Sequence, residues 1–95
     1  MGDKRDLLVL LTKIYKAGKD GYTGFTEEFE ELDEEFQKLM KKIFKDKMHT
    51  DSTASKCWTV VNNIRNMGSC SMDPRRDWLE ESKQLIRELK DELKD

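Results

Sequence analysis

Apolar side chains recur every three or four residues through four stretches of the chain, a spacing typical of helices with one buried face. These stretches predict helices over residues 4–17, 27–48, 53–67 and 74–94. Because the segments between them are short, consecutive helices should lie antiparallel. The sequence therefore predicts an all-α fold, a compact up-down-up-down four-helix bundle, with residues 1–95 as a single helical domain.

The predicted core consists of the apolar stripe of each helix. Its members are Leu7, Leu8, Leu11, Ile14 and Tyr15; Phe29, Leu32, Phe36, Leu39, Met40, Ile43 and Phe44; Ala54, Cys57, Trp58, Val61 and Ile64; and Trp78, Leu79, Leu85, Ile86, Leu89 and Leu93. Residues with capping preferences stand at the helix ends. We expect N-caps at Asp3, Thr26, Asp51 or Ser52, and Asp73, with Pro74 in the first turn and helix ends at Gly18 and Gly68.

Charge is distributed unevenly along the chain. Charged residues make up 40% of the sequence, yet residues 49–72 contain only Asp51, Lys56 and Arg65 as formal charges. Within the predicted helix over 53–67, one face carries small polar residues at positions i, i+4, i+7 and i+11, namely Ser55, Thr59, Asn62 and Asn66. Such residues have poor helix propensity, so contact with a partner explains them better than helix stability does.

This contrast predicts a non-enzymatic protein-binding or scaffold module that presents residues 49–72 to a protein partner of unknown identity. The predicted partner-binding residues are Ser55, Lys56, Thr59, Asn62, Asn63 and Asn66. Dense Glu and Lys with well-placed caps over residues 26–48 and 73–95 are also typical of designed helices. An engineered scaffold, produced by de novo design, is therefore a further interpretation of the same pattern.

Nucleic-acid binding is an alternative interpretation, because a polar helix can act as the recognition helix of a helix-turn-helix. Suitable side chains for phosphate and base contacts are Lys56, Asn62, Asn63, Arg65 and Asn66. A net charge of −2 and a long preceding helix disfavour this interpretation. A bundle without a binding site, or one that self-associates through Val9 and Leu10 or through the uncharged face, is the other alternative. Monomer and homodimer both stay open.

Residues capable of catalysis or metal binding are too few and too irregularly spaced to predict either function. His49 is the only histidine, and its spacing from Cys57 and Cys70 matches no standard zinc pattern. A Cys–His nucleophile pair would need an orienting group and an oxyanion site, and the sequence supplies no motif for them. We therefore expect no enzyme activity, no cofactor and no metal site.

The remaining features concern location. The longest apolar run, Leu7 to Leu11, falls far short of the roughly 20 residues that span a membrane, and no cleavage site follows it. We expect no membrane association and no signal peptide. The protein is therefore expected to be a cytoplasmic or recombinant soluble protein. Cys57 lies near the start of the predicted third helix and Cys70 just beyond its end, so the two should be roughly 16 Å apart, too far for a disulfide.

Overall fold

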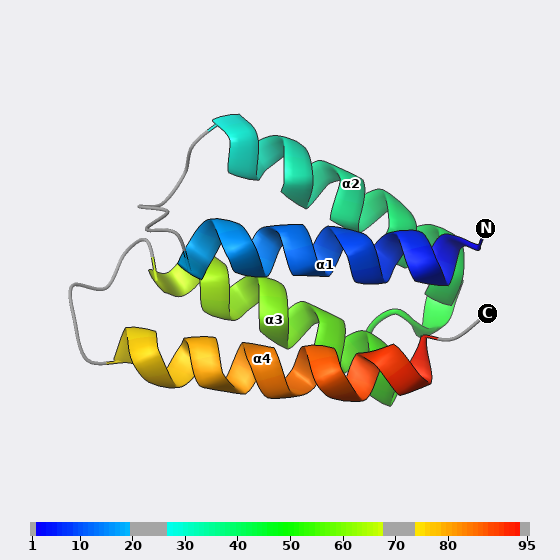
Figure 1. Ribbon diagram of the computed structural model, residues 1–95. Helices are drawn as coiled ribbons and strands as arrows, with labels where there is room; N and C mark the ends of the chain where they lie inside the picture. The colour runs from blue at the N-terminus through cyan, green and yellow to red at the C-terminus, as the bar shows by residue number, and fades with distance from the viewer. Residues whose placement is uncertain (1, 20–26, 68–73, 94–95) are drawn as a thin grey trace.

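The computed structural model describes residues 2–19, 27–67 and 74–93, and the described chain is a four-helix bundle without strands. The helices are α1 (Asp3–Lys19), α2 (Glu27–Phe44), α3 (Ser52–Met67) and α4 (Pro74–Glu92), with a short 3-10 helix, η1 (Lys45–Lys47), after α2. Successive helices run in opposite directions (Figure 1). The predicted up-down-up-down bundle is confirmed.

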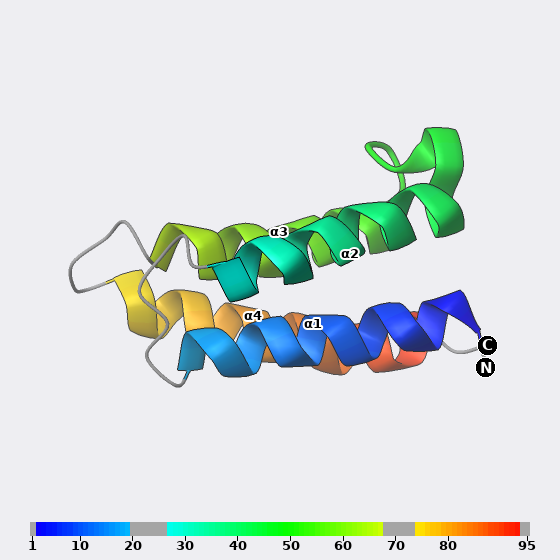
Figure 2. The ribbon, with the colours of Figure 1, turned by 90° about the horizontal axis from the view of Figure 1, so that it is seen from above.

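The bundle has two layers, α2 beside α3 and α1 beside α4 (Figure 2). Helix α1 contacts all three other helices, whereas α2 packs mainly on α1 and makes a smaller contact with α3. The core between the layers is apolar: Leu7, Leu10, Leu11, Ile14, Phe29, Phe36, Met40, Ala54, Cys57, Val60, Val61, Ile64, Met67, Ile86, Leu89 and Leu93 are buried. All of the predicted stripe residues either belong to this core or pack partly buried against it.

The prediction that Gly18 ends the first helix is wrong. Helix α1 continues through Gly18 to Lys19, and Gly18 is buried. A Cβ atom placed on Gly18 would lie 2.8 Å from Cδ1 of Ile64, so the missing side chain is what lets α1 approach α3. At the other end, the Asp6 amide donates to the Gly2 carbonyl at 3.1 Å. Asp3 is therefore the first helical residue and not the N-cap.

The prediction that the second helix reaches residue 48 is also wrong. Helix α2 ends at Phe44 because Lys45 adopts a left-handed backbone conformation with φ of 51°, which interrupts the helical hydrogen bonds. Asp51 is confirmed as the N-cap of α3, since its Oδ1 accepts from the amides of Thr53 (2.8 Å) and Ala54 (3.1 Å). The predicted caps Thr26, Gly68 and Asp73 lie outside the described residues.

Candidate protein-binding face of α3

Small polar residues at helical spacing form an outward face of α3. Ser55, Asn62 and Asn66 are exposed and Thr59 is half-buried, as their helical spacing implies. The Thr59 hydroxyl donates to the Ser55 carbonyl at 2.9 Å, a bond within the helix that adds no contact to a neighbouring helix. Four of the six predicted partner-binding residues therefore lie together on one accessible surface.

The other two predicted partner-binding residues, Lys56 and Asn63, bind α4. The Lys56 ammonium pairs with Glu88 at 3.1 Å and with Glu92. Asn63 is only 7% exposed, and its Nδ2 donates to Glu81 Oε1 at 2.7 Å and to the buried Ser82 hydroxyl at 3.2 Å. Because these groups hold α3 against α4, neither belongs to the accessible face.

The ion pairs between α3 and α4 also shift the pKa values of the paired side chains. Hydrogen bonds from Lys56 and, secondarily, from Thr53 hold the pKa of the Glu92 carboxyl below its ordinary value. The Thr53 hydroxyl donates to Glu92 Oε1 at 2.7 Å. Hydrogen bonds to Glu92 and Glu88 in turn raise the pKa of Lys56. Both charges are thus paired within the bundle.

A shallow hollow of about 400 Å³ opens beside the uncharged face. Its lining combines the segment before α3 with the helix itself: Met48, His49, Ser55, Trp58, Thr59 and Asn62. None of these side chains is an acid, a lysine or an arginine. The nearest arginine, Arg65, donates to Asn62 Oδ1 at 3.3 Å and is neutralised by Asp33 of α2 at 2.8 Å.

Trp58 lies between the core and this hollow. The sequence places Trp58 on the core stripe, but the structure leaves the side chain half-buried. Its ring meets Phe36 edge-on at a centroid distance of 4.9 Å and stacks on His49 at 6.2 Å. The indole Nε1 is buried and has no hydrogen-bond partner among the described residues. Trp58 therefore gives the hollow an aromatic wall.

The predicted segment 49–72 includes His49 and Trp58, but neither is among the six predicted partner-binding residues, and Met48 lies outside the segment. His49 looked like an isolated loop residue, and its stacking depends on how the segment after α2 folds back onto α3. The sequence holds no local signal for it, because the apolar spacing continues through Met48 and conceals the early end of α2, which is what returns residues 48–49 to the bundle.

Within residues 2–19, 27–67 and 74–93, the side chains capable of chemistry do not converge. Cys57 is buried in the core, and desolvation raises the pKa of its thiol to about 12, which keeps it protonated near neutral pH. His49 stacks on Trp58. Among the described residues, no three His, Cys, Asp or Glu side chains gather as metal ligands. Nor does any helix within the described ranges have the length and apolar character to cross a membrane.

Comparison of the chain with protein-family models, with curated proteins and with solved structures found no match. A function must therefore be inferred from the geometry of the chain itself.

Proposed function

We propose that this chain is a non-enzymatic protein-binding module whose partner docks on the outward face of α3. The observation that carries the proposal is the hollow beside Trp58, whose lining contains no acid, lysine or arginine and includes Ser, Thr and Asn side chains. A helical bundle whose other faces are dense in charge suits the role of a scaffold, natural or engineered.

The hollow has the composition of a small recognition site. Tryptophan dominates binding energy at many protein interfaces, and a partly exposed ring offers apolar area at little entropic cost. The surrounding hydroxyl and amide groups, from Ser55, Thr59 and Asn62, can donate and accept hydrogen bonds. We infer a partner segment that inserts one apolar or aromatic side chain against Trp58 and hydrogen-bonds through its backbone to this rim.

Nucleic-acid binding has weaker support from the same geometry. Of the five side chains suited to phosphate or base contacts, Lys56 and Arg65 are neutralised by carboxylates and Asn63 is buried. A DNA ligand would have to break these ion pairs to use the cations. Helix α2, with 18 residues, is also long for the first helix of a helix-turn-helix.

A displayed random-peptide library provides the test, because it samples many short partner sequences at once. Selection uses the wild-type chain, and each enriched peptide is then titrated against a variant with Ser55, Thr59, Asn62 and Asn66 changed to Glu. We expect the variant to keep its helical circular dichroism and to bind at least about tenfold more weakly, because unpaired carboxylates would face the peptide. A Trp78→Phe background makes Trp58 the reporter, and binding should shift its emission.

The control variant carries Thr12→Glu and Gln84→Glu, two exposed positions on α1 and α4. It should bind the selected peptides as tightly as the wild type. The proposal fails if no peptide is enriched, or if the α3 variant and the control bind equally well. Salt-sensitive binding to a DNA duplex, lost on removing Lys56 and Arg65, would instead favour the nucleic-acid alternative.

A further inference from the structure

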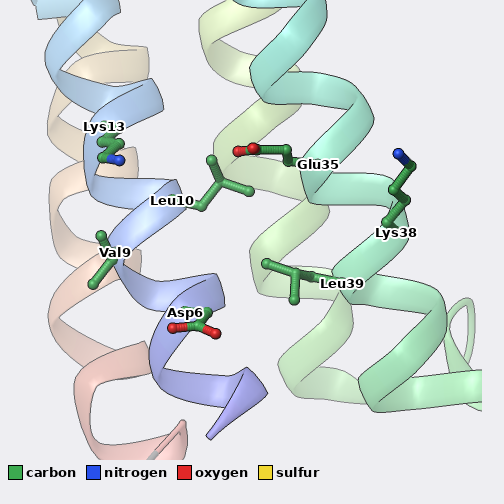
Figure 3. A pocket seen from close by; sticks show the side chains of 7 residues that line it. All are labelled: Asp6, Val9, Leu10, Lys13, Glu35, Lys38 and Leu39. Carbon is green, nitrogen blue, oxygen red and sulfur yellow. The ribbon is translucent and has the colours of Figure 1, made fainter. Parts of the chain in front are cut away.

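A second surface, on the side of α1 that faces away from α3, combines an exposed apolar side chain with acidic and basic side chains. Val9 of α1 is 50% exposed, the only large apolar side chain exposed to this extent in the described ranges. Beside it, a hollow of about 430 Å³ opens between α1 and α2. Figure 3 shows Leu10 directed toward α2 and Leu39 directed toward α1, so that these two side chains form the apolar floor of the hollow.

Charges of both signs surround this floor. Asp6 and Lys13 stand on α1, and Glu35 and Lys38 stand on α2. Figure 3 shows Glu35 directed toward α1 at the level of Lys13, whereas Lys38 is directed away from α1 and Asp6 stands at the other end of the hollow. Two acids and two bases therefore line the hollow. All four side chains are exposed.

Lys13 and Glu35, which stand level with each other on the two helices, make the surface complementary to itself. A second copy, turned by half a revolution about an axis that lies in the plane of the surface and along the helices, places its α2 over α1. Lys13 of each copy then faces Glu35 of the other. Two-fold symmetric contacts of this kind are the commonest way in which identical chains associate. The contact would also cover Val9.

The neighbouring hollow between α1 and α4 lacks this property. Its volume is about 290 Å³, and its charged lining consists of Lys13, Lys16 and Lys90. A second copy docked there would bring lysines against lysines, so the complementary surface is the one between α1 and α2.

We propose that the α1–α2 hollow is a docking surface for a second copy of this chain, giving a weak, salt-sensitive homodimer. It is distinct from the α3 face, so a dimer formed in this way leaves the hollow beside Trp58 open. The apolar floor is small and exposed ion pairs contribute little each. We therefore expect association at high micromolar concentration and low salt, weakening as salt screens the four charges.

Charge reversal in two complementary variants tests the proposal without fixing the dimer geometry. Lys13→Glu with Lys38→Glu makes the surrounding charges all acidic, and Asp6→Lys with Glu35→Lys makes them all basic. Sedimentation velocity at low salt, from micromolar to millimolar protein, should show dimer for the wild type. Each variant alone should have a dimer dissociation constant at least about tenfold higher than that of the wild type, because like charges then face each other. An equal mixture of the two should recover a dimer, identified as the mixed species by native mass spectrometry.

A matched control separates this surface from net charge. Lys83→Glu with Arg87→Glu changes the net charge by the same amount as the all-acidic variant, at exposed positions on α4. This control should self-associate like the wild type. A wild type that stays monomeric at millimolar concentration, a mixture that forms no mixed dimer, or a control that dissociates as readily as the all-acidic variant would each overturn the proposal. Circular dichroism checks that every variant is folded.

Discussion

At the scale of single residues, Gly18 shows why a glycine in a sequence has two meanings. A glycine after an apolar stripe commonly ends a helix, because it adopts a left-handed conformation without strain. Here it stays helical, and its lack of a side chain admits Ile64 from α3. Which residue of another helix packs against a glycine depends on the tertiary structure. No pattern within residues 4–19 indicates that Ile64 would pack there.

We expect Gly18→Ala to destabilise the protein by about 1 kcal/mol, measured as the free energy of unfolding in urea. The new Cβ would lie 2.8 Å from Cδ1 and 3.1 Å from Cγ2 of the fully buried Ile64. Overpacking of this kind costs about 1–3 kcal/mol, and the better helix propensity of alanine offsets about 1 kcal/mol of it. In an Ile64→Val background, which lacks Cδ1, the same substitution should be neutral or stabilising. Equal costs in both backgrounds would contradict the proposed clash.

A second prediction at this scale concerns Asn63, whose amide donates a hydrogen bond to the fully buried Ser82 hydroxyl. Asn63→Ala should lower the free energy of unfolding by about 1–3 kcal/mol, because it leaves a buried polar group without a partner. The pair Asn63→Leu with Ser82→Ala removes both polar groups and should recover most of that loss. Peptide binding on α3 should not change in folded Asn63 variants, because this side chain faces α4. Weaker binding would return Asn63 to the partner-binding set.

The buried Cys57 thiol predicts a loss of stability in alkali. Its pKa is raised by burial from 9.0 to about 12, so the unfolded chain releases this proton at lower pH than the folded chain does. The thiol has no effect on the free energy of unfolding below the unfolded pKa of 9.0, and it lowers stability as the pH rises toward 12. Urea unfolding at about pH 8 and about pH 10 should show wild type losing about 1.4 kcal/mol more than Cys57→Ala. Equal losses would mean that the folded state ionises the thiol as readily as the unfolded chain.

At the scale of the helix, α3 combines a well-packed inner side with an outer side that is poor in helix formers. Ser55, Thr59, Asn62 and Asn66 replaced together by Ala should therefore stabilise the protein by up to about 2 kcal/mol, summed from intrinsic propensities. Thermal or urea unfolding measures the gain. If the proposed function holds, the same variant loses affinity for the selected peptides. A quadruple variant less stable than the wild type would show that these side chains support the fold.

The sequence predicted the existence of all four helices. Helix ends that depend on neighbouring residues in the sequence were predictable, and ends that depend on tertiary packing were not. The start of α3 was within reach, because Asp51 caps it through its own side chain, a bond between neighbours in sequence. The end of α2 could not be predicted from the sequence, because the apolar spacing continues through Met48 while Lys45 takes an unfavourable left-handed conformation. Met48 packs against the core from outside the helix, which satisfies its apolar character without extending α2.

At the scale of the whole molecule, α2 is the helix with the least support. It packs mainly on α1 and makes only a small contact with α3, whereas α1 contacts every other helix. Local opening should therefore detach α2 at a lower free energy than global unfolding requires. Native-state hydrogen exchange by NMR should show α2 amides exchanging through this partial opening and α1 amides only through global unfolding. Identical opening free energies in both helices would argue for one cooperative unit.

The candidate site was harder to predict from the sequence than the fold was. Helical spacing was enough to group Ser55, Thr59 and Asn62 on one face, because spacing within a helix is fixed by its geometry. The stacking of His49 on Trp58 joins two elements, and the pairing of Lys56 with Glu88 joins two helices. Contacts between elements depend on rotation and register in the bundle, which the apolar stripes restrict without determining.

The alternating directions of the helices also bear on how quickly the chain reaches its native state. The two most extensive helix contacts, α3 with α4 and α1 with α2, each join helices that are consecutive in the chain. Such contacts require only a local search, and helical bundles dominated by them fold in microseconds to milliseconds. During synthesis, a growing chain can form its first pair of helices before the second pair exists. Apolar faces are then exposed only briefly, which limits the time available for aggregation.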